Sequence, residues 1–167
     1  MSDGFDGHVR KGVVTNFVAN LVINAAIAWF LLRGHAELTT WGAASYGPDL
    51  LITGFLLSVI VAAIVLETHR RQAARGELVP PAGVSDWLGR AAGTSRVAVA
   101  LGFGVAGVLT GAALLGVLSS TVDAVSPSAY AGIKGVWAGL LAAWIVRPAA
   151  TIGARQGATG LPAADLA

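Results

Sequence analysis

Three asparagines inside one apolar stretch are the most unusual chemical feature of the sequence. Asn16, Asn20 and Asn24 are spaced by four residues, which places them on one face of a helix, about 6 Å apart along its axis. Amides that face lipid are costly, so this face is expected to point toward protein or water. Two interpretations stay open. The amides either bond backbone carbonyls or each other on neighbouring helices, worth about 0.6 kcal/mol each, or they line a path for a polar solute.

Lys134 is the one ionisable side chain placed clearly inside an apolar stretch, about one turn from its end. Three interpretations are open: snorkelling of the ammonium to the interface, an ion pair with Asp49 or Asp123, or an anion site. Asp49, Glu67 and Asp123 lie at the ends of apolar stretches. A proton-coupled pump normally needs an acid inside the membrane, so this class is disfavoured.

Several kinds of chemistry are missing from the sequence. Cysteine is absent, which excludes disulfides, thiol catalysis and thiolate metal sites. The histidines lie outside the apolar stretches, and the sequence has no Ser–His–Asp set and no cluster of metal ligands. We therefore expect no enzymatic activity, no cofactor and no metal. A formal charge of +2 without a basic patch also argues against nucleic acid.

Small residues recur at helical spacing in the apolar stretches. Residues 102–107 (GFGVAG) match the dinucleotide fingerprint, but that motif requires a preceding strand, and here the glycines lie inside an apolar stretch. Small residues on one stripe let helix backbones approach each other in lipid. The glycines expected to pack helices, within one chain or between chains, are Gly104, Gly107, Gly111, Gly135 and Gly139.

Four long apolar stretches must position these residues. The chain is 55% hydrophobic and 12% charged, whereas a soluble domain carries about 25% charged residues. Each stretch is long enough for a helix to cross a hydrocarbon core about 30 Å thick. The stretches run from about Val13 to Leu32, Leu50 to Leu66, Val97 to Leu118 and Ala129 to Val146. They predict an all-α, polytopic membrane protein with four transmembrane helices arranged as two similar helical hairpins.

The expected organisation is a single membrane domain over residues 1–167. It contains a first hairpin at about 13–67, a loop at 68–96, a second hairpin at 97–147 and a tail at 148–167. Asp49 is expected to cap the second helix, and Arg147-Pro148 to close the fourth. A shift of 80 residues superposes the two halves without a gap, and places Leu38-Thr39 on Leu118-Ser119 and Glu67 on Arg147. We hypothesise a duplication, and a pair between Glu67 and Arg147.

Basic residues predict the orientation of the chain. Nine of the eleven Lys and Arg residues lie in the two terminal segments and the long central loop. The positive-inside rule then places both termini and that loop in the cytoplasm. Trp29, Trp41 and Tyr130 are expected near the outer interface.

Two stretches carry a family resemblance. Asn20 to Trp29 (NLVINAAIAW), leading to Gly47-Pro48-Asp49, is the first, and Gly132 to Pro148 (GIKGVWAGLLAAWIVRP) is the second. They resemble small uncharacterised bacterial inner-membrane proteins made of two-helix repeats, in which a Lys opens the last helix and Arg or Pro closes it. The resemblance implies four helices and a bacterial inner membrane, and no particular activity.

Two functions stay open at this point. The first is a non-enzymatic structural or accessory membrane protein that acts through helix packing with itself or a partner. The second is a small channel or transporter for an ion or small polar solute, with a path along Asn16, Asn20, Asn24 and Lys134. The expected partners are the lipid bilayer and either further copies of the chain or other membrane subunits.

Overall fold

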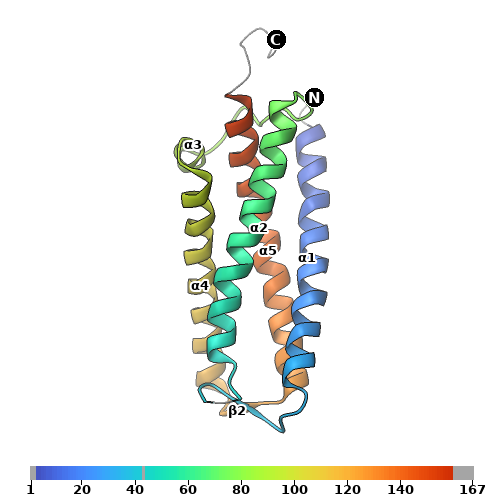
Figure 1. Ribbon diagram of the computed structural model, residues 1–167, viewed down its shortest axis with the longest axis vertical. Coiled ribbons are helices and arrows are strands. Elements are labelled where there is room, and N and C mark those ends of the chain that lie inside the picture. Colours follow the sequence, from blue (N-terminus) through green and yellow to red (C-terminus); the bar gives the residue numbers. More distant parts are fainter. Residues whose placement is uncertain (1–2, 43, 160–167) are drawn as a thin grey trace.

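The computed structural model describes residues 3–42 and 44–159 and consists of long helices joined at their ends (Figure 1). Its elements are α1 (Asp3–Leu32), β1 (Leu38–Thr39), α2 (Gly47–Ala74), α3 (Asp86–Ala92), α4 (Arg96–Thr121), β2 (Ala124–Val125) and α5 (Pro127–Ala158). Helices α1, α2, α4 and α5 are long and apolar enough to cross a membrane, by length and composition. The prediction of an all-α protein with four such helices is confirmed.

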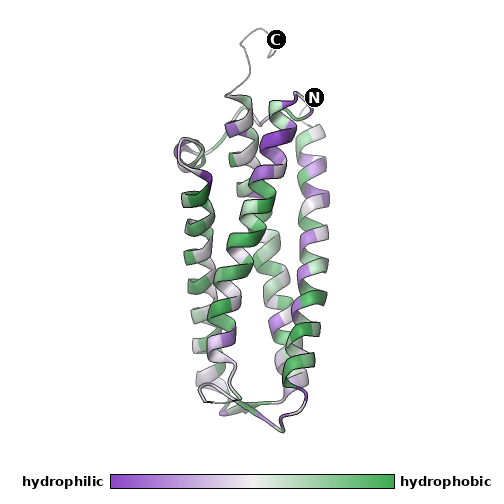
Figure 2. Cartoon of the chain, in the orientation of Figure 1, coloured by the Kyte–Doolittle hydropathy of each residue, from purple (hydrophilic) through white to green (hydrophobic). Residues whose placement is uncertain are grey.

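Hydropathy varies along the helices in the way that a membrane protein requires. Hydrophobic residues dominate the middle of the helices, and hydrophilic residues gather toward the end at which α1 begins and α5 ends (Figure 2). Val18, Val22 and Trp29, on the face of α1 opposite the asparagines, are all exposed. Many other large apolar side chains are exposed too, which is costly in water and ordinary in lipid.

Helices α2 and α5 form the central pair of the bundle. Helix α1 packs against α5, and α4 packs against α2, whereas α1 with α2 and α4 with α5 approach each other much less. Each hairpin therefore packs against the other hairpin rather than on itself, and a groove remains between α1 and α2. At one end of the bundle, β1 and β2 pair antiparallel and tie the two connecting loops together.

Glycines allow the close approach of these helices. A Cβ atom added to Gly107 of α4 would collide with the backbone of Gly54 in α2. In α5, a Cβ atom on Gly139 would lie 2.8 Å from the carbonyl oxygen of Phe17 in α1. The other expected packing glycines face α2 (Gly104 and Gly111) or α1 (Gly135). All five thus pack helices within one chain.

Helix α5 continues through Pro148, where the sequence predicted its end. A proline inside a helix removes a backbone donor and costs about 3 kcal/mol. Burial offsets this cost, because Ile152 has no exposed surface and Gly153 lies directly against the backbone of Leu66 in α2. The segment from residue 148 to Ala158 is therefore part of the bundle, not a tail.

The ungapped superposition of the two halves is wrong for the connecting loops. Leu38 and Thr39 form β1, whereas Leu118 and Ser119, their expected equivalents, lie in α4. The loop after α1 is much longer than the loop after α4, so no single shift aligns both helices of each hairpin. The packing of α1 on α5 does correspond to that of α4 on α2 when the hairpins are exchanged. Duplication itself stays a prediction.

Candidate functional site

The three asparagines of α1 bond within their own helix. The amide Nδ2 atoms of Asn16, Asn20 and Asn24 each donate to the carbonyl oxygen four residues earlier, at 2.9 Å. The expected bonds to neighbouring helices are absent from the described residues, because a short amide side chain reaches the preceding turn first. An amide has two N–H donors and a carbonyl acceptor. The second donor and the acceptor of each Asn are therefore left for a group outside the described chain.

Lys134 of α5 makes an ion pair with Asp49 of α2. The lysine is 2% exposed, and its Nζ atom lies 2.7 Å from both carboxylate oxygens of Asp49. The hydroxyl of Thr53 donates to the same carboxylate at 3.4 Å. Of the interpretations that the sequence left open, the structure shows the ion pair with Asp49. Asp49 itself lies in the first turn of α2 and is not its N-cap, which is Tyr46.

Tyr130 is a member of this site that the sequence did not reveal. It was expected at the outer interface, but it is fully buried, and its hydroxyl donates to Asp49 at 2.5 Å. A buried phenol needs such a partner for its hydroxyl. The available signal was its position four residues before Lys134, since residues at that spacing share a helix face.

One groove between α1 and α2 gathers these polar side chains. It has a volume of about 420 Å³ and is lined by all five residues predicted to form a polar path or interhelical bonds: Asn16, Asn20, Asn24, Asp49 and Lys134. Large apolar side chains complete the lining, and they are exposed: Ile23, Ile27, Ile52, Leu56, Ile60 and Ile64. The arrangement is a polar stripe along the helices, bordered by side chains that suit lipid.

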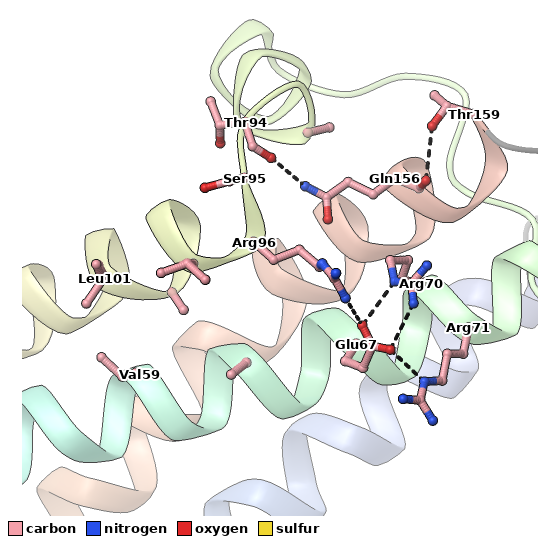
Figure 3. A pocket seen from close by; sticks show the side chains of 14 residues that line it. Val59, Glu67, Arg70, Arg71, Thr94, Ser95, Arg96, Leu101, Gln156 and Thr159 are labelled. Carbon is pink, nitrogen blue, oxygen red and sulfur yellow. Dashed lines mark hydrogen bonds and ion pairs between the residues drawn. The ribbon is translucent and has the colours of Figure 1, made fainter.

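A second polar cluster lies at the other end of α2 (Figure 3). The carboxylate of Glu67 accepts hydrogen bonds from Arg70, Arg71 and Arg96, at 2.5 to 3.0 Å. The predicted pair of Glu67 with Arg147 is wrong, because the guanidinium of Arg147 instead lies 3.2 Å from a carboxylate oxygen of Asp6. Helix α4 begins beside Glu67, so its first residue, Arg96, is the basic partner that reaches this carboxylate.

The groove presents amide, carboxylate, ammonium and hydroxyl groups that can bind a polar ligand. Within the described residues, no group of three or more His, Cys, Asp or Glu side chains is placed to hold a metal ion. Comparison with protein-family models, with curated proteins and with solved structures finds no match for this chain. The resemblance to bacterial two-helix-repeat proteins and the absence of catalysis therefore stay predictions.

Proposed function

We propose that this protein carries a small polar solute through the membrane along the groove between α1 and α2. The meeting of Asn16, Asn20 and Asn24 with the pair of Asp49 and Lys134 in one groove supports this function. The sequence placed these residues on three separate helices and left a shared polar path as one of two interpretations. Their convergence on one groove is what favours a path over structural hydrogen bonding.

The remaining donor and acceptor of each amide favour a polar occupant. An unsatisfied polar group away from water costs about 1–3 kcal/mol, and the described residues provide no further partner for the three amides. One water takes up about 30 Å³ of liquid volume, so a groove of about 420 Å³ accommodates a file of waters or a small solute. The charges of Asp49 and Lys134 cancel. A neutral polar solute therefore suits the groove better than an ion.

The groove is open along one side, where exposed isoleucines border it. A solute path needs that side sealed from lipid, and we propose that a second copy of the chain covers it.

The proposed setting is a bacterial inner membrane with both termini in the cytoplasm. The basic residues support this orientation, because the start of α1, the end of α2, the start of α4 and the end of α5 carry most of them.

Swelling of proteoliposomes in glycerol and in urea tests the proposal, with potassium chloride as the ionic probe. Wild-type vesicles are expected to swell faster than protein-free vesicles in a neutral solute. Asn20→Leu removes an amide from the middle of the stripe and is expected to abolish the difference. Val22→Leu changes an exposed apolar residue of the same helix, and is expected to keep it. The proposal would be contradicted if wild-type vesicles swell no faster than protein-free vesicles, or if the two variants give equal swelling rates.

An accessory role is the second candidate, and the lateral opening of the groove favours it. A transmembrane helix of another subunit, carrying polar side chains at matching heights, would satisfy the asparagines and cover the isoleucines. Purification in mild detergent is then expected to recover a second membrane protein with the wild-type chain. The partner should be lost from Asn20→Leu and retained by Val22→Leu, and neither protein should make vesicles permeable.

A further inference from the structure

A cleft lined by residues of α2, α4 and α5 lies at the end of the bundle where α1 begins and α5 ends. It opens between the last turns of α2 and the first turns of α4, with Gln156 of α5 and the C-cap residue Thr159 at its edge (Figure 3). Its volume is about 970 Å³. This cleft shares no lining residue with the groove between α1 and α2, so a ligand can bind here independently of the proposed transport.

The polar half of the cleft carries an excess of positive charge. Arg70, Arg71 and Arg96 surround the single carboxylate of Glu67. Three guanidinium groups and one carboxylate give this half of the cleft a net charge of about +2. Each guanidinium has five N–H donors, and Glu67 occupies only one or two of them on each arginine. The side chains of Arg71 and Arg96 are 64% and 53% exposed, so their remaining donors are accessible.

The other half of the cleft is apolar. Val59 and Ala63 of α2 face Val97 and Leu101 of α4 along the direction that leads into the membrane-spanning part of both helices. Ser95 lies at the boundary between the two halves, where it caps the first turn of α4. The cleft thus places free guanidinium donors directly above an apolar slot, at the level where the apolar spans end.

We propose that this cleft binds one anionic phospholipid, with its phosphate on Arg70, Arg71 and Arg96 and an acyl chain along Val59 and Leu101. Guanidinium groups bind phosphate through paired hydrogen bonds. Basic pockets between transmembrane helices are suited to anionic lipid headgroups. Glu67 holds the three arginines on one side of the cleft and leaves the charge excess that a phosphodiester neutralises. The apolar slot favours a lipid over a free phosphate ion, because a phosphate ion has no acyl chain to fill the slot.

Binding of phosphatidylglycerol to the detergent-purified protein, followed by native mass spectrometry, tests this site. The double variant Arg70→Gln/Arg96→Gln is expected to bind on the order of 25-fold more weakly, because each basic side chain at a membrane surface contributes about a fivefold factor. The matched control Arg75→Gln/Arg90→Gln removes the same charge from exposed positions outside the cleft and should bind like the wild type. Equal losses in the two double variants, or no loss in either, would overturn the proposal.

A second pair of variants keeps every charge and tests the apolar slot. Ala63→Trp fills the slot from α2 and is expected to weaken phosphatidylglycerol binding about tenfold, whereas Ile64→Trp, which faces the other groove, should have little effect. Phosphatidylcholine, which has no net charge, should bind weakly to all variants. Glycerol phosphate and inorganic phosphate are competitors without acyl chains. If either displaces the lipid at millimolar concentration, the site recognises a free phosphate and the lipid proposal fails.

Discussion

Removing the charge of Asp49 should destabilise the protein because it leaves Lys134 buried without a counterion. The side chain of Lys134 is only 3% exposed, and the part of the chain that the structure describes gives it one acidic partner, Asp49. Breaking a fully buried ion pair costs about 3–5 kcal/mol. The side chain of Asp49 is 33% exposed, so solvent reaches one side of this pair and the expected cost of Asp49→Asn falls to about 2–3 kcal/mol.

The reciprocal change should cost less. Lys134→Met leaves Asp49 with the donors of Tyr130 and Thr53, so we expect a loss of about 1–2 kcal/mol. The double variant removes both charges and should lie within about 1 kcal/mol of the wild type, because replacing a buried ion pair by uncharged groups is often nearly neutral. The assay is unfolding in mixed detergent micelles followed by helical circular dichroism, with Asp123→Asn in an exposed loop as the control. Losses that simply add in the double variant would refute the reasoning.

Three further predictions concern packing, the asparagines and orientation. Gly107→Ala should lower the free energy of unfolding by about 1–3 kcal/mol, because the added Cβ meets the backbone of α2. The control Gly116→Ala places its Cβ in open space and should raise the free energy of unfolding by up to about 1 kcal/mol. Equal effects of the two substitutions in the same unfolding assay would contradict this packing. Asn20→Leu should change that free energy by less than about 1 kcal/mol, since its amide bonds only its own helix, and a loss of 3 kcal/mol would reveal a partner on another helix. A reporter fused after Ala167 should be active in the cytoplasm; activity confined to the periplasm would reverse the orientation.

The helices were predictable because membrane-spanning segments depend on one property, the length of an apolar run. Their ends were less predictable. A proline usually ends a helix, but at Pro148 the burial of the following residues against α2 outweighs this local preference. The pairing of helices was not predictable either, since small residues occur on several faces. Only the structure shows that Gly107 meets α2 and that Gly139 meets α1.

The composition of the groove was predicted more fully than its geometry. Spacing by four residues placed the asparagines on one face, and Asp49 was one of two acids considered for Lys134. The direction of the Asn amides could not be predicted, because a bond to the preceding turn of the same helix competes with any partner across the bundle. The prediction of a pair between Glu67 and Arg147 was wrong for a related reason. Matching position in two halves of the chain does not specify how each helix is rotated about its axis.

The absence of cysteine from the chain makes water access to the groove directly measurable. Single cysteines at Asn20 and Asn24 would be exposed to a charged, membrane-impermeant thiol reagent in proteoliposomes, beside a lipid-facing control at Val22. If the groove is a polar path, Asn24→Cys and Asn20→Cys react at rates well above that of Val22→Cys, and glycerol flux falls as they are labelled. The proposed path would be contradicted if Asn20→Cys and Asn24→Cys, in a folded protein, react no faster than Val22→Cys.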